Sequence, residues 1–339
     1  MKDFEKKAVF ILGHTICIFI LIYCFVSSKE AVFVSPTPAV FSEELSVIPD
    51  VVPAEIITIS PKPEVTEPVT SVTPAPRPEL TEEEVASDDR EKIKQQVQQK
   101  IAEGEYAELD NQNNEWWFQR KDNHISSGSG EAFDFTPYQG YYLKKATTED
   151  DKVIYLTLDC GYGSANTEVI LDVLKKHDVK VTFFVTKMFL DADPESVRRM
   201  VEDGHIVGNH SFSHKELPTL TEEEIYQEII LWEEKFYEIT GVRMPLFFRP
   251  PEGAYSKRTM QITEDLGYKT IFWSIAYYDY NQNDQPSVQY ILDHFEEYHH
   301  NGAITLMHND SSANKNAMDD VITFLKEEGY RFGTLEELP

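Results

Sequence analysis

Residues that can act as acids, bases or metal ligands stand at the ends of successive apolar runs from residue 153 onward. They are Asp159, Cys160, His210, His214, Arg249, Asp279 and His308. The H-x₃-H spacing of the two histidines can bring two imidazoles to one divalent metal ion. Taken one by one, an acid can cap a helix, a histidine can lie exposed in a turn, and a cysteine can be a small buried apolar residue. Their shared position at the ends of the runs favours one common site.

The elements that would position these residues alternate along the chain. We expect strands at 153–159, 179–185, 205–209, 246–249, 269–275, 303–307 and 330–335, and helices near 166–177, 194–203, 221–240, 256–266, 287–299 and 314–328. Short strands that are apolar on both faces and separated by helices predict parallel βαβ units. Seven such units favour a distorted (β/α)7 barrel of the α/β class over an open sheet. Chemistry in such barrels lies at the C-terminal ends of the strands, where the polar residues stand.

The N-terminus has the pattern of a membrane anchor. MKDFEKK carries three lysines and precedes an uncharged run of 19 residues at 8–26. This run is long enough to cross a bilayer, it exceeds the usual apolar region of a signal peptide, and the lysines favour a cytoplasmic N-terminus. We therefore expect a single-pass membrane protein whose remaining chain lies outside the cell. The alternative is a secreted protein whose signal peptide is cleaved near VSS at 26–28.

A proline-rich segment separates the expected anchor from the rest of the chain. Ten of the 18 prolines lie between Pro36 and Pro78, and proline fixes φ and removes hydrogen-bond donors, so 29–80 is expected to be a disordered, extended stalk. The next segment, 81–104, opens with a Thr81–Glu84 capping box and predicts a helix. Its narrow apolar stripe of Ile93, Val97 and Ile101 would pack on the domain or on another chain. The expected divisions are 1–28, 29–80, 81–104 and 105–339, with a core at 153–338.

Charge and cysteine content exclude two classes of protein. The chain has 59 acidic and 31 basic residues, a net charge of −28, so nucleic acid is not an expected partner. Cys17 and Cys24 lie inside the apolar run at 8–26, which leaves Cys160 alone in the remaining chain. A single cysteine cannot build the disulfide framework of a small secreted domain. The sequence carries no signal for an oligomeric state.

Residues 153–338 resemble the polysaccharide deacetylase family, carbohydrate esterase family 4. Its five motifs appear in order: TLDCG for T-F-D-D-G, HSFSH for H-S/T-x-x-H, RPPEG for R-P-P-Y-G, YYDY for D-W or D-Y, and LMH for the L-x-H type. NEWWFQRKDNH at 114–124 and the segment 161–186 look most like the delta-lactam-forming de-N-acetylases of the spore cortex. The resemblance implies a peptidoglycan glycan strand as substrate, a divalent metal as cofactor, and a domain that faces the bacterial cell wall.

The resemblance also implies roles for the residues at the strand ends. His210 and His214 would bind the metal, and Asp159 would be the general base that takes a proton from water. Arg249 and Asp279 would hold and tune that base. These roles together describe metal-assisted hydrolysis, in which the metal lowers the pKa of its water.

The remaining implied roles concern the leaving group and the sugar. His308 would be the general acid that protonates the leaving amine, and the backbone N–H of Glu252 would help to hold the oxyanion. Substrate contacts are expected from Pro251, Glu252, Trp273, Leu306 and Tyr162.

Two positions depart from the family pattern. Cys160 stands where the family has a second aspartate, normally the third metal ligand, and where the delta-lactam branch usually has Asn. A thiolate with two imidazoles suits zinc, so we expect Zn²⁺ with Cys160 as a ligand. The alternatives are a cysteine packed beside a two-histidine metal site, or a lost site. Glu252 replaces Tyr or Arg and would repel the lactyl carboxylate of muramic acid if its side chain faced it, unless only its backbone matters.

The function expected from these residues is metal-dependent hydrolysis of N-acetyl groups on peptidoglycan amino sugars. N-acetylmuramic acid is the first expectation, in support of delta-lactam formation in the spore cortex, and N-acetylglucosamine is the second. Another acetylated polysaccharide such as acetylated xylan is a further alternative. The alternative of another class is a wall-binding protein that has lost catalysis. Cys160 favours that alternative, and the complete remainder of the catalytic set favours an enzyme.

Overall fold

The structure is a computed structural model that describes residues 89–145, 148, 151–243 and 245–339. The expected anchor, the proline-rich stalk and the Thr81–Glu84 capping box lie outside the described residues. Within the described part of the chain, no helix combines the length and apolarity needed to cross a bilayer.

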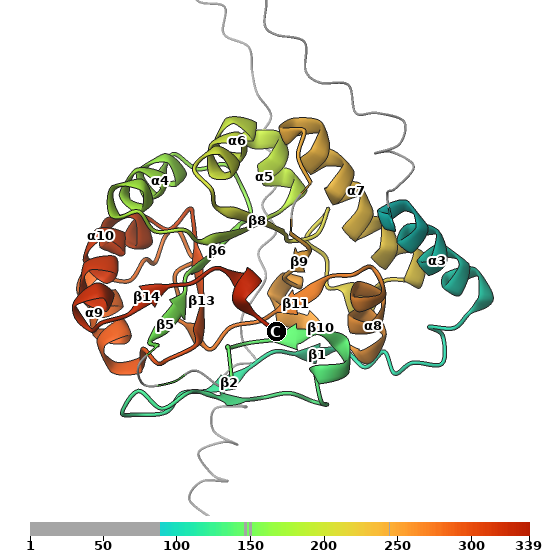
Figure 1. The fold of residues 1–339 in the computed structure, drawn as a ribbon, viewed down its shortest axis with the longest axis horizontal. Coiled ribbons are helices and arrows are strands. Elements are labelled where there is room, and N and C mark those ends of the chain that lie inside the picture. Colours follow the sequence, from blue (N-terminus) through green and yellow to red (C-terminus); the bar gives the residue numbers. More distant parts are fainter. Residues whose placement is uncertain (1–88, 146–147, 149–150, 244) are drawn as a thin grey trace, which may run out of the picture. The chain divides into compact units, whose positions relative to one another are not determined.

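A sheet of parallel strands forms the centre of the described domain (Figure 1). Its strands are β4 (Gly140–Tyr141), β5 (Val153–Tyr155), β6 (Thr157–Cys160), β7 (Thr182–Val185), β8 (Ile206–Asn209), β9 (Phe247–Phe248), β11 (Lys269–Ile271), β12 (Ile275–Ala276), β13 (Ala303–His308) and β14 (Arg331–Phe332). They are ordered β14-β5-β13-β6-β7-β8-β9-β11-β4, with β12 paired to β13. Because β11 pairs with β9 and β12 pairs with β13, residues 269–276 connect two distant parts of the sheet.

Side chains from six of these strands meet in one interior cluster, which makes the sheet barrel-like. They are Val153, Tyr155, Phe184, Ile206, Phe247, Ile271 and Ile304. The alternate residues of β5 and β6 face the opposite side of the sheet. Ile154, Leu158 and Cys160 pack there into a second, larger cluster with helix residues. The α/β class, the parallel strands and the barrel-like curvature predicted from sequence are confirmed.

Two predicted strands are broken, and both predictions were wrong in that respect. In the segment 269–275, the N–H of Phe272 donates to Tyr141 O at 2.7 Å, whereas the N–H of Ser274 donates to Ile304 O at 2.9 Å. The backbone therefore changes its hydrogen-bond partner between β11 and β12. In the segment 153–159, the N–H of Thr157 donates to the hydroxyl of Thr305 on β13 at 3.0 Å. A side chain thus takes the place of a backbone acceptor where β5 ends and β6 begins.

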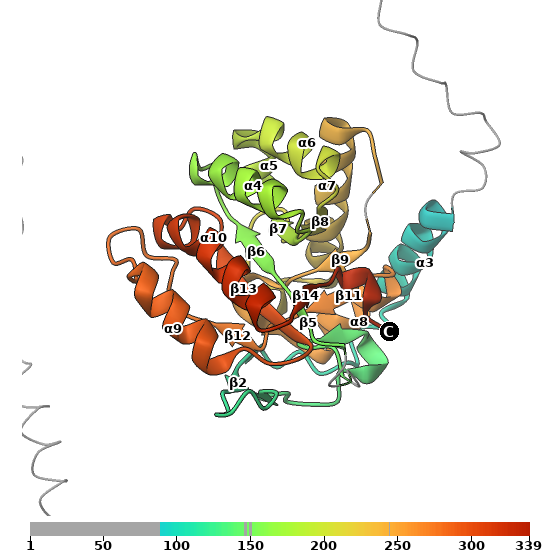
Figure 2. The ribbon, with the colours of Figure 1, turned by 60° about the vertical axis from the view of Figure 1, so that its left-hand side comes forward.

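Six predicted helices are present close to their predicted bounds. They are α4 (Asn166–His177), α6 (Pro194–Glu202), α7 (Glu222–Thr240), α8 (Lys257–Asp265), α9 (Val288–Tyr298) and α10 (Ser312–Glu327). The capping box of Thr221 and Glu224 at the start of α7 is formed. Sequence analysis missed the short helix α5 (Lys187–Ala192), which Thr186 caps by accepting the N–H of Phe189. Helices α4, α9 and α10 lie side by side along one side of the sheet (Figure 2).

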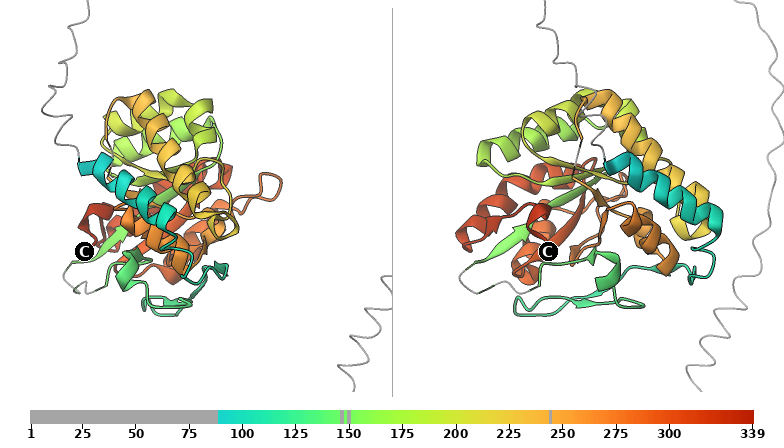
Figure 3. Two further views of the ribbon diagram at one scale, coloured as in Figure 1. Left: turned by 90° about the vertical axis from the view of Figure 1, so that its right-hand side faces the viewer. Right: turned by 45° about the vertical axis from the view of Figure 1, so that its right-hand side comes forward.

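The segment before the sheet packs onto the domain. Helix α3 (Asp89–Glu103) lies beside α7 and α8 (Figure 3). Val97 of its apolar stripe is buried against Ile225 and Tyr268, so the stripe packs on its own domain. Farther along, β1 (Asn114–Glu115) pairs antiparallel with β10 (Ala254–Tyr255), and β2 (Phe118–Gln119) pairs with β3 (Gly128–Ser129). The chain before residue 146 is therefore tied to the turn that follows β9.

Candidate active site

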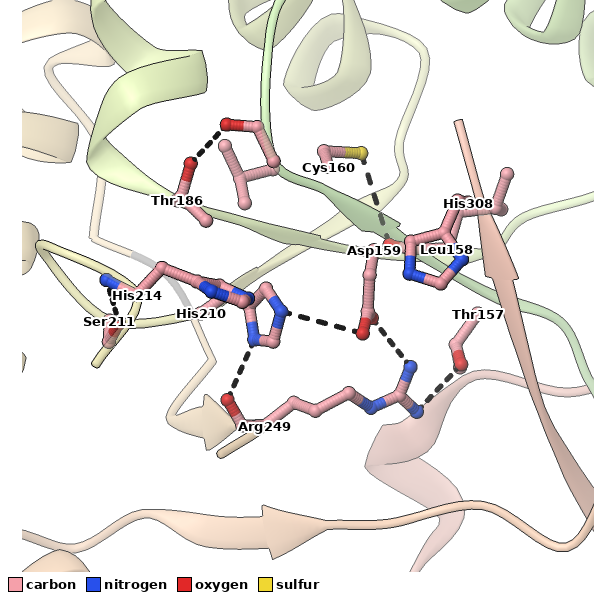
Figure 4. Close-up of polar contacts among 12 residues, drawn as sticks. Thr157, Leu158, Asp159, Cys160, Thr186, His210, Ser211, His214, Arg249 and His308 are labelled. Atoms are coloured by element: carbon pink, nitrogen blue, oxygen red, sulfur yellow. Dashed lines mark hydrogen bonds and ion pairs between the residues drawn. The ribbon is translucent and has the colours of Figure 1, made fainter. Parts of the chain in front are cut away.

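Asp159 and Arg249 form a buried ion pair at the ends of β6 and β9 (Figure 4). The guanidinium Nη1 lies 2.7 Å from Asp159 Oδ1, and Nη2 donates to the hydroxyl of Thr157 at 2.7 Å. Arg249 Nε also donates to Ile271 O at 3.2 Å, so backbone and side chains fix the guanidinium from several directions. The prediction that Arg249 holds Asp159 is confirmed by this geometry.

The charge of Arg249 sets the protonation of Asp159. Burial by itself raises the pKa of the Asp159 carboxyl, but the charge and hydrogen bond of Arg249, together with the charges of His210 and His308, outweigh burial and hold that pKa below its ordinary value. Asp159 is therefore an ionised carboxylate at neutral pH. An ionised, fixed carboxylate can accept a proton from a water molecule beside it.

The two histidines of HSFSH lie together next to this carboxylate (Figure 4). Their ring centroids are 4.9 Å apart and the rings are nearly perpendicular. His210 Nδ1 lies 2.8 Å from the carbonyl oxygen of Arg249, and since a carbonyl only accepts, Nδ1 carries the proton. His210 Nε2 therefore presents its lone pair, at 3.5 Å from Asp159 Oδ2. Burial lowers the pKa of His210 to about 4, which keeps the imidazole neutral.

The loop that carries the histidines is held in an uncommon backbone conformation. Ser211 and His214 have φ values of 66° and 56°, in the left-handed region that L-residues rarely adopt. The hydroxyl of Ser211 accepts the N–H of His214 at 2.9 Å. The buried carboxylate of Glu228, on α7, accepts the N–H of Ser213 at 2.7 Å and its hydroxyl as well. Contacts from α7 and from within the loop thus fix the position of the histidines.

Cys160 does not belong to this group, so the expectation that it is a zinc ligand was wrong. Successive residues of a strand point to opposite faces, and Cys160 therefore faces away from Asp159 (Figure 4). Its Sγ lies 3.9 Å from Leu158 O, inside the apolar cluster against α4 and α10. Burial raises the pKa of the thiol well above its usual range, which disfavours a thiolate. The alternative of a cysteine packed near a two-histidine site agrees with the structure.

The residues that remain fit a metal held by two histidines. Among the described residues, no group of three or more His, Cys, Asp or Glu side chains is arranged as a metal site. However, His210 has the arrangement usual for a ligating imidazole: one ring nitrogen donates to a carbonyl, and the other offers a lone pair on the side of Asp159. The neutral His210 and the adjacent His214, next to the carboxylate of Asp159, are chemically suited to a divalent ion with open coordination positions.

We predict that Cys160→Ala leaves metal binding unchanged. The side chain contacts apolar residues, so removing its sulfur should cost only stability, on the order of 1 kcal/mol. Metal content by atomic absorption and the urea midpoint measure the two effects separately, with His210→Ala as the control that loses metal. If Cys160→Ala is fully folded but has lost its metal, Cys160 is a metal ligand after all.

Glu228 gives a second prediction, because it is the buried anchor of the histidine loop. Glu228→Ala leaves the N–H and hydroxyl of Ser213 without their acceptor, and we expect any affinity of the two histidines for a divalent metal to fall by about 10- to 100-fold. Glu238→Ala, an exposed acid on the same helix, is the matched control. Competition against a chromophoric chelator measures the affinities, and equal affinities for the two variants would refute the anchoring role.

His308 pairs with Asp279, which corrects the role expected for Asp279. The His308 Nδ1–H donates to Asp279 Oδ1 at 2.7 Å, and the backbone N–H of His308 donates to Oδ2 at 2.8 Å. Asn314 Nδ2 donates to the same carboxylate at 2.6 Å. Asp279 follows β12, which pairs with β13, and His308 on β13 is the register partner of Asp159 on β6. Asp279 therefore holds the histidine and not Asp159.

This pairing prepares His308 to carry a proton. Burial by itself lowers the pKa of His308, but the hydrogen bond and charge of Asp279, together with the charges of Asp159 and Asp310, outweigh burial, so the pKa lies above its ordinary value. Because Nδ1 is engaged with Asp279, Nε2 is the nitrogen that can donate to a substrate. The two shifts thus favour an ionised Asp159 and a protonated His308 in the same site.

The residues expected to contact the substrate differ in their burial and in their distance from the acid and the base. Glu252 is exposed with φ 57°, and Pro251 beside it is buried. The ring of Trp273 lies 5.7 Å from the Arg249 guanidinium, at the edge of the acid–base group. Leu306 is half-buried on β13, two residues before His308, and Tyr162 is 63% exposed in the loop after β6.

Sequence analysis missed several residues that complete the site. Thr157 binds the Arg249 guanidinium, Asn314 binds Asp279, and Glu228 holds the histidine loop. Glu228 could have been found, because an acid among the apolar residues Ile225 and Ile229 on one face of a predicted helix is unusual. Thr157 is the first residue of the TLDCG motif, although its contact with Arg249 was not predicted, and Asn314 carried no comparable signal.

Comparisons with known proteins agree with this geometry. The family profile "Polysaccharide deacetylase" matches residues 146–271. The peptidoglycan-N-acetylmuramic acid deacetylase PdaA of Bacillus subtilis is 42% identical over 225 residues, which cover 66% of this chain and 84% of that protein. The solved structure of Bacillus subtilis PdaA, a family 4 carbohydrate esterase, matches with a TM-score of 0.65 over 68% of this chain and 98% of that chain, at 41% identity. A family 4 pseudoenzyme from Bacillus anthracis matches with a TM-score of 0.54 and 31% identity, over 59% of this chain and 68% of that one.

Proposed function

The chain belongs to the polysaccharide deacetylase family, and from this membership we propose that it is a metal-dependent hydrolase of N-acetyl groups on peptidoglycan, with N-acetylmuramic acid as its first substrate. The observation that carries the proposal is a carboxylate and a histidine on the adjacent strands β6 and β13 whose pKa values are shifted in opposite directions. Arg249 favours the ionised form of Asp159, and Asp279 favours the protonated form of His308. An acid and a base whose pKa values are pushed apart can act on one acetamide from two sides.

The residues of the chain divide the reaction as follows. Asp159 accepts the proton of the attacking water, and Arg249 stabilises its charge before that transfer. His308 donates its Nε2 proton to the nitrogen of the leaving amine, and Asp279 stabilises the imidazolium until then. The backbone N–H of Glu252, in the left-handed turn after β9, is the proposed donor to the oxyanion.

His210 and His214 are the residues that would hold the metal. A bound metal supplies Lewis acidity, which polarises the acetyl carbonyl and lowers the pKa of water. With the thiolate excluded, two imidazoles still favour a transition metal over magnesium or calcium, and we retain zinc as the proposed ion.

The proposed sugar follows from the name of the relative with 42% identity, a peptidoglycan-N-acetylmuramic acid deacetylase. Removal of the acetyl group from muramic acid leaves a free amine near the lactyl carboxyl. These two groups can close to a delta-lactam with loss of water, which is the product proposed for the spore cortex.

We also propose that residues 8–26 anchor the protein in the membrane, with the catalytic domain outside the cell at the wall. Fractionation of cells that produce the whole chain tests this placement. A full-length protein in the membrane fraction supports the anchor, and a shortened protein in the medium supports cleavage.

Acetate release from peptide-stripped peptidoglycan tests the proposed activity. The purified protein with zinc should release acetate, a chelator should stop the release, and added zinc should restore it. Release from acetylated xylan or chitooligosaccharide alone would reassign the substrate. Binding to the glycan without release would favour a wall-binding protein, the second candidate, which the similarity to a pseudoenzyme and the loss of the second motif aspartate support.

A further inference from the structure

We propose that Trp116, which lies before the residues matched by the family profile, is a positioning residue for the base and oxyanion side of the site. It joins the turn after β9 to the break between β11 and β12, the two segments that surround Arg249. The inference rests on the proposed function, because it concerns the same reaction.

The first contact is to the turn that presents the Glu252 N–H. The N–H of Trp116 donates to Gly253 O at 2.9 Å, and β1 pairs with β10 immediately after the turn (Figure 1). Glu252 and Gly253 have φ values of 57° and 69°, so two consecutive residues are left-handed. A non-glycine residue stays in this region only where its surroundings hold it there. Strand β1 and the N–H of Trp116, the residue directly after it, supply that restraint.

The second contact is to the strand break. The indole Nε1–H of Trp116 donates to the carbonyl oxygen of Trp273 at 3.0 Å. The indole ring stacks on Phe272 with a centroid distance of 4.8 Å, and Trp116 is only 6% exposed. The ring and its N–H therefore fix both the side chain of Phe272 and the peptide that follows it.

The strand break in turn contacts the partner of the base. Arg249 Nη2 lies 3.4 Å from Phe272 O, and the Trp273 ring lies 5.7 Å from the guanidinium. A Cβ added to Gly253 would lie 2.9 Å from the Trp273 ring and 3.0 Å from Trp116 Cβ. The turn at 251–253, the strand break at 272–274 and Trp116 are thus in close contact. A shift of Trp116 would therefore move the groups around Arg249.

This arrangement predicts a particular kinetic defect. The direction of the Asp159 carboxylate and of the Glu252 N–H matters most when charge develops in the transition state. Loss of the positioning should therefore lower kcat and leave KM nearly unchanged.

The experiment compares Trp116→Phe, Trp116→Ala and the control Trp117→Phe in the full-length, zinc-loaded protein. Phenylalanine keeps a ring for the stack on Phe272 but removes the indole donor to Trp273 O. Trp117 is the neighbouring tryptophan and is 60% exposed. Acetate release gives kcat and KM, and hydrogen exchange is followed separately in 182–185, 251–256 and 272–276.

For Trp116→Phe we expect kcat to fall roughly 10-fold, and for Trp116→Ala roughly 100-fold, with KM within about twofold of wild type. Exchange should rise in 251–256 and 272–276 but not in the core strand at 182–185. Trp117→Phe should match wild type in every measurement.

Two outcomes overturn the inference. One is wild-type kcat in Trp116→Phe and Trp116→Ala at full core protection. The other is a kcat that falls only in proportion to lost protection at 182–185, which would indicate a purely structural role. If wild type itself releases no acetate, the proposed function fails, and the exchange pattern alone decides whether Trp116 holds the two segments.

Discussion

Asp159→Asn is expected to lower kcat for acetate release by about 10²- to 10⁴-fold, with little change in KM. Asparagine has nearly the same shape, and its side-chain oxygen can still accept the Arg249 Nη1–H. It cannot take a proton from water, so the loss falls on the chemical step. A variant that keeps more than a tenth of the wild-type kcat would refute the assignment of Asp159 as the base.

The same substitution should also lower stability, and the two effects have to be separated. Replacing the carboxylate by a neutral amide leaves the buried guanidinium of Arg249 without a counter-charge, which typically costs about 3–5 kcal/mol. Urea unfolding at pH 7 measures this cost, and kcat is then compared well below the unfolding midpoint. The double variant Asp159→Asn/Arg249→Met removes the unpaired charge, so it should regain stability without regaining activity.

Asp279→Asn is expected to shift the alkaline limb of the kcat–pH profile to lower pH and to reduce kcat at pH 8 by about 10- to 100-fold. Asp279 raises the pKa of His308 through a hydrogen bond and its charge. The acid is active while protonated, so activity is lost as pH rises through this raised pKa. Without the carboxylate charge the pKa of His308 falls, and the loss begins at lower pH.

The stability of the folded protein should follow the same sign. A histidine whose folded pKa is raised adds stability below its unfolded pKa of about 6.5, and that stability is lost as pH rises through the folded pKa. Asp279→Asn should therefore lose more stability at pH 6 than at pH 9. Asp293→Asn, an exposed acid on α9, is the control for both measurements. An unchanged alkaline limb in Asp279→Asn would contradict the pairing with His308.

Local patterns in the sequence were sufficient to predict the parallel α/β fold and most of its helices and strands. The alternation of buried strands with capped helices was visible directly, as at Thr221 and Glu224. The break at Phe272–Ser274 was not, because nothing in the local pattern marks it and only its distant partners Tyr141 and Ile304 divide the segment.

The site was predictable in its residues but not in all of its pairings. Asp159, His210 and Arg249 meet as expected from their strand ends. Cys160 was misplaced because the motif does not reveal which way its side chain turns at the end of β6, and here it packs into the apolar cluster with α4 and α10. The partner of Asp279 depends on β13 lying between β6 and β12, a long-range order that no local pattern reveals.

Mass spectrometry of glycan strands treated with the whole zinc-loaded protein is the most direct test of the central claim, that Asp159 and His308 act as base and acid on an N-acetyl group. The account predicts that muramic residues lose the mass of one acetyl group after treatment with wild type, with further loss of water where the lactam closes, and that Asp159→Asn leaves them intact. Glycan that binds the wild-type protein and keeps every acetyl group would contradict it.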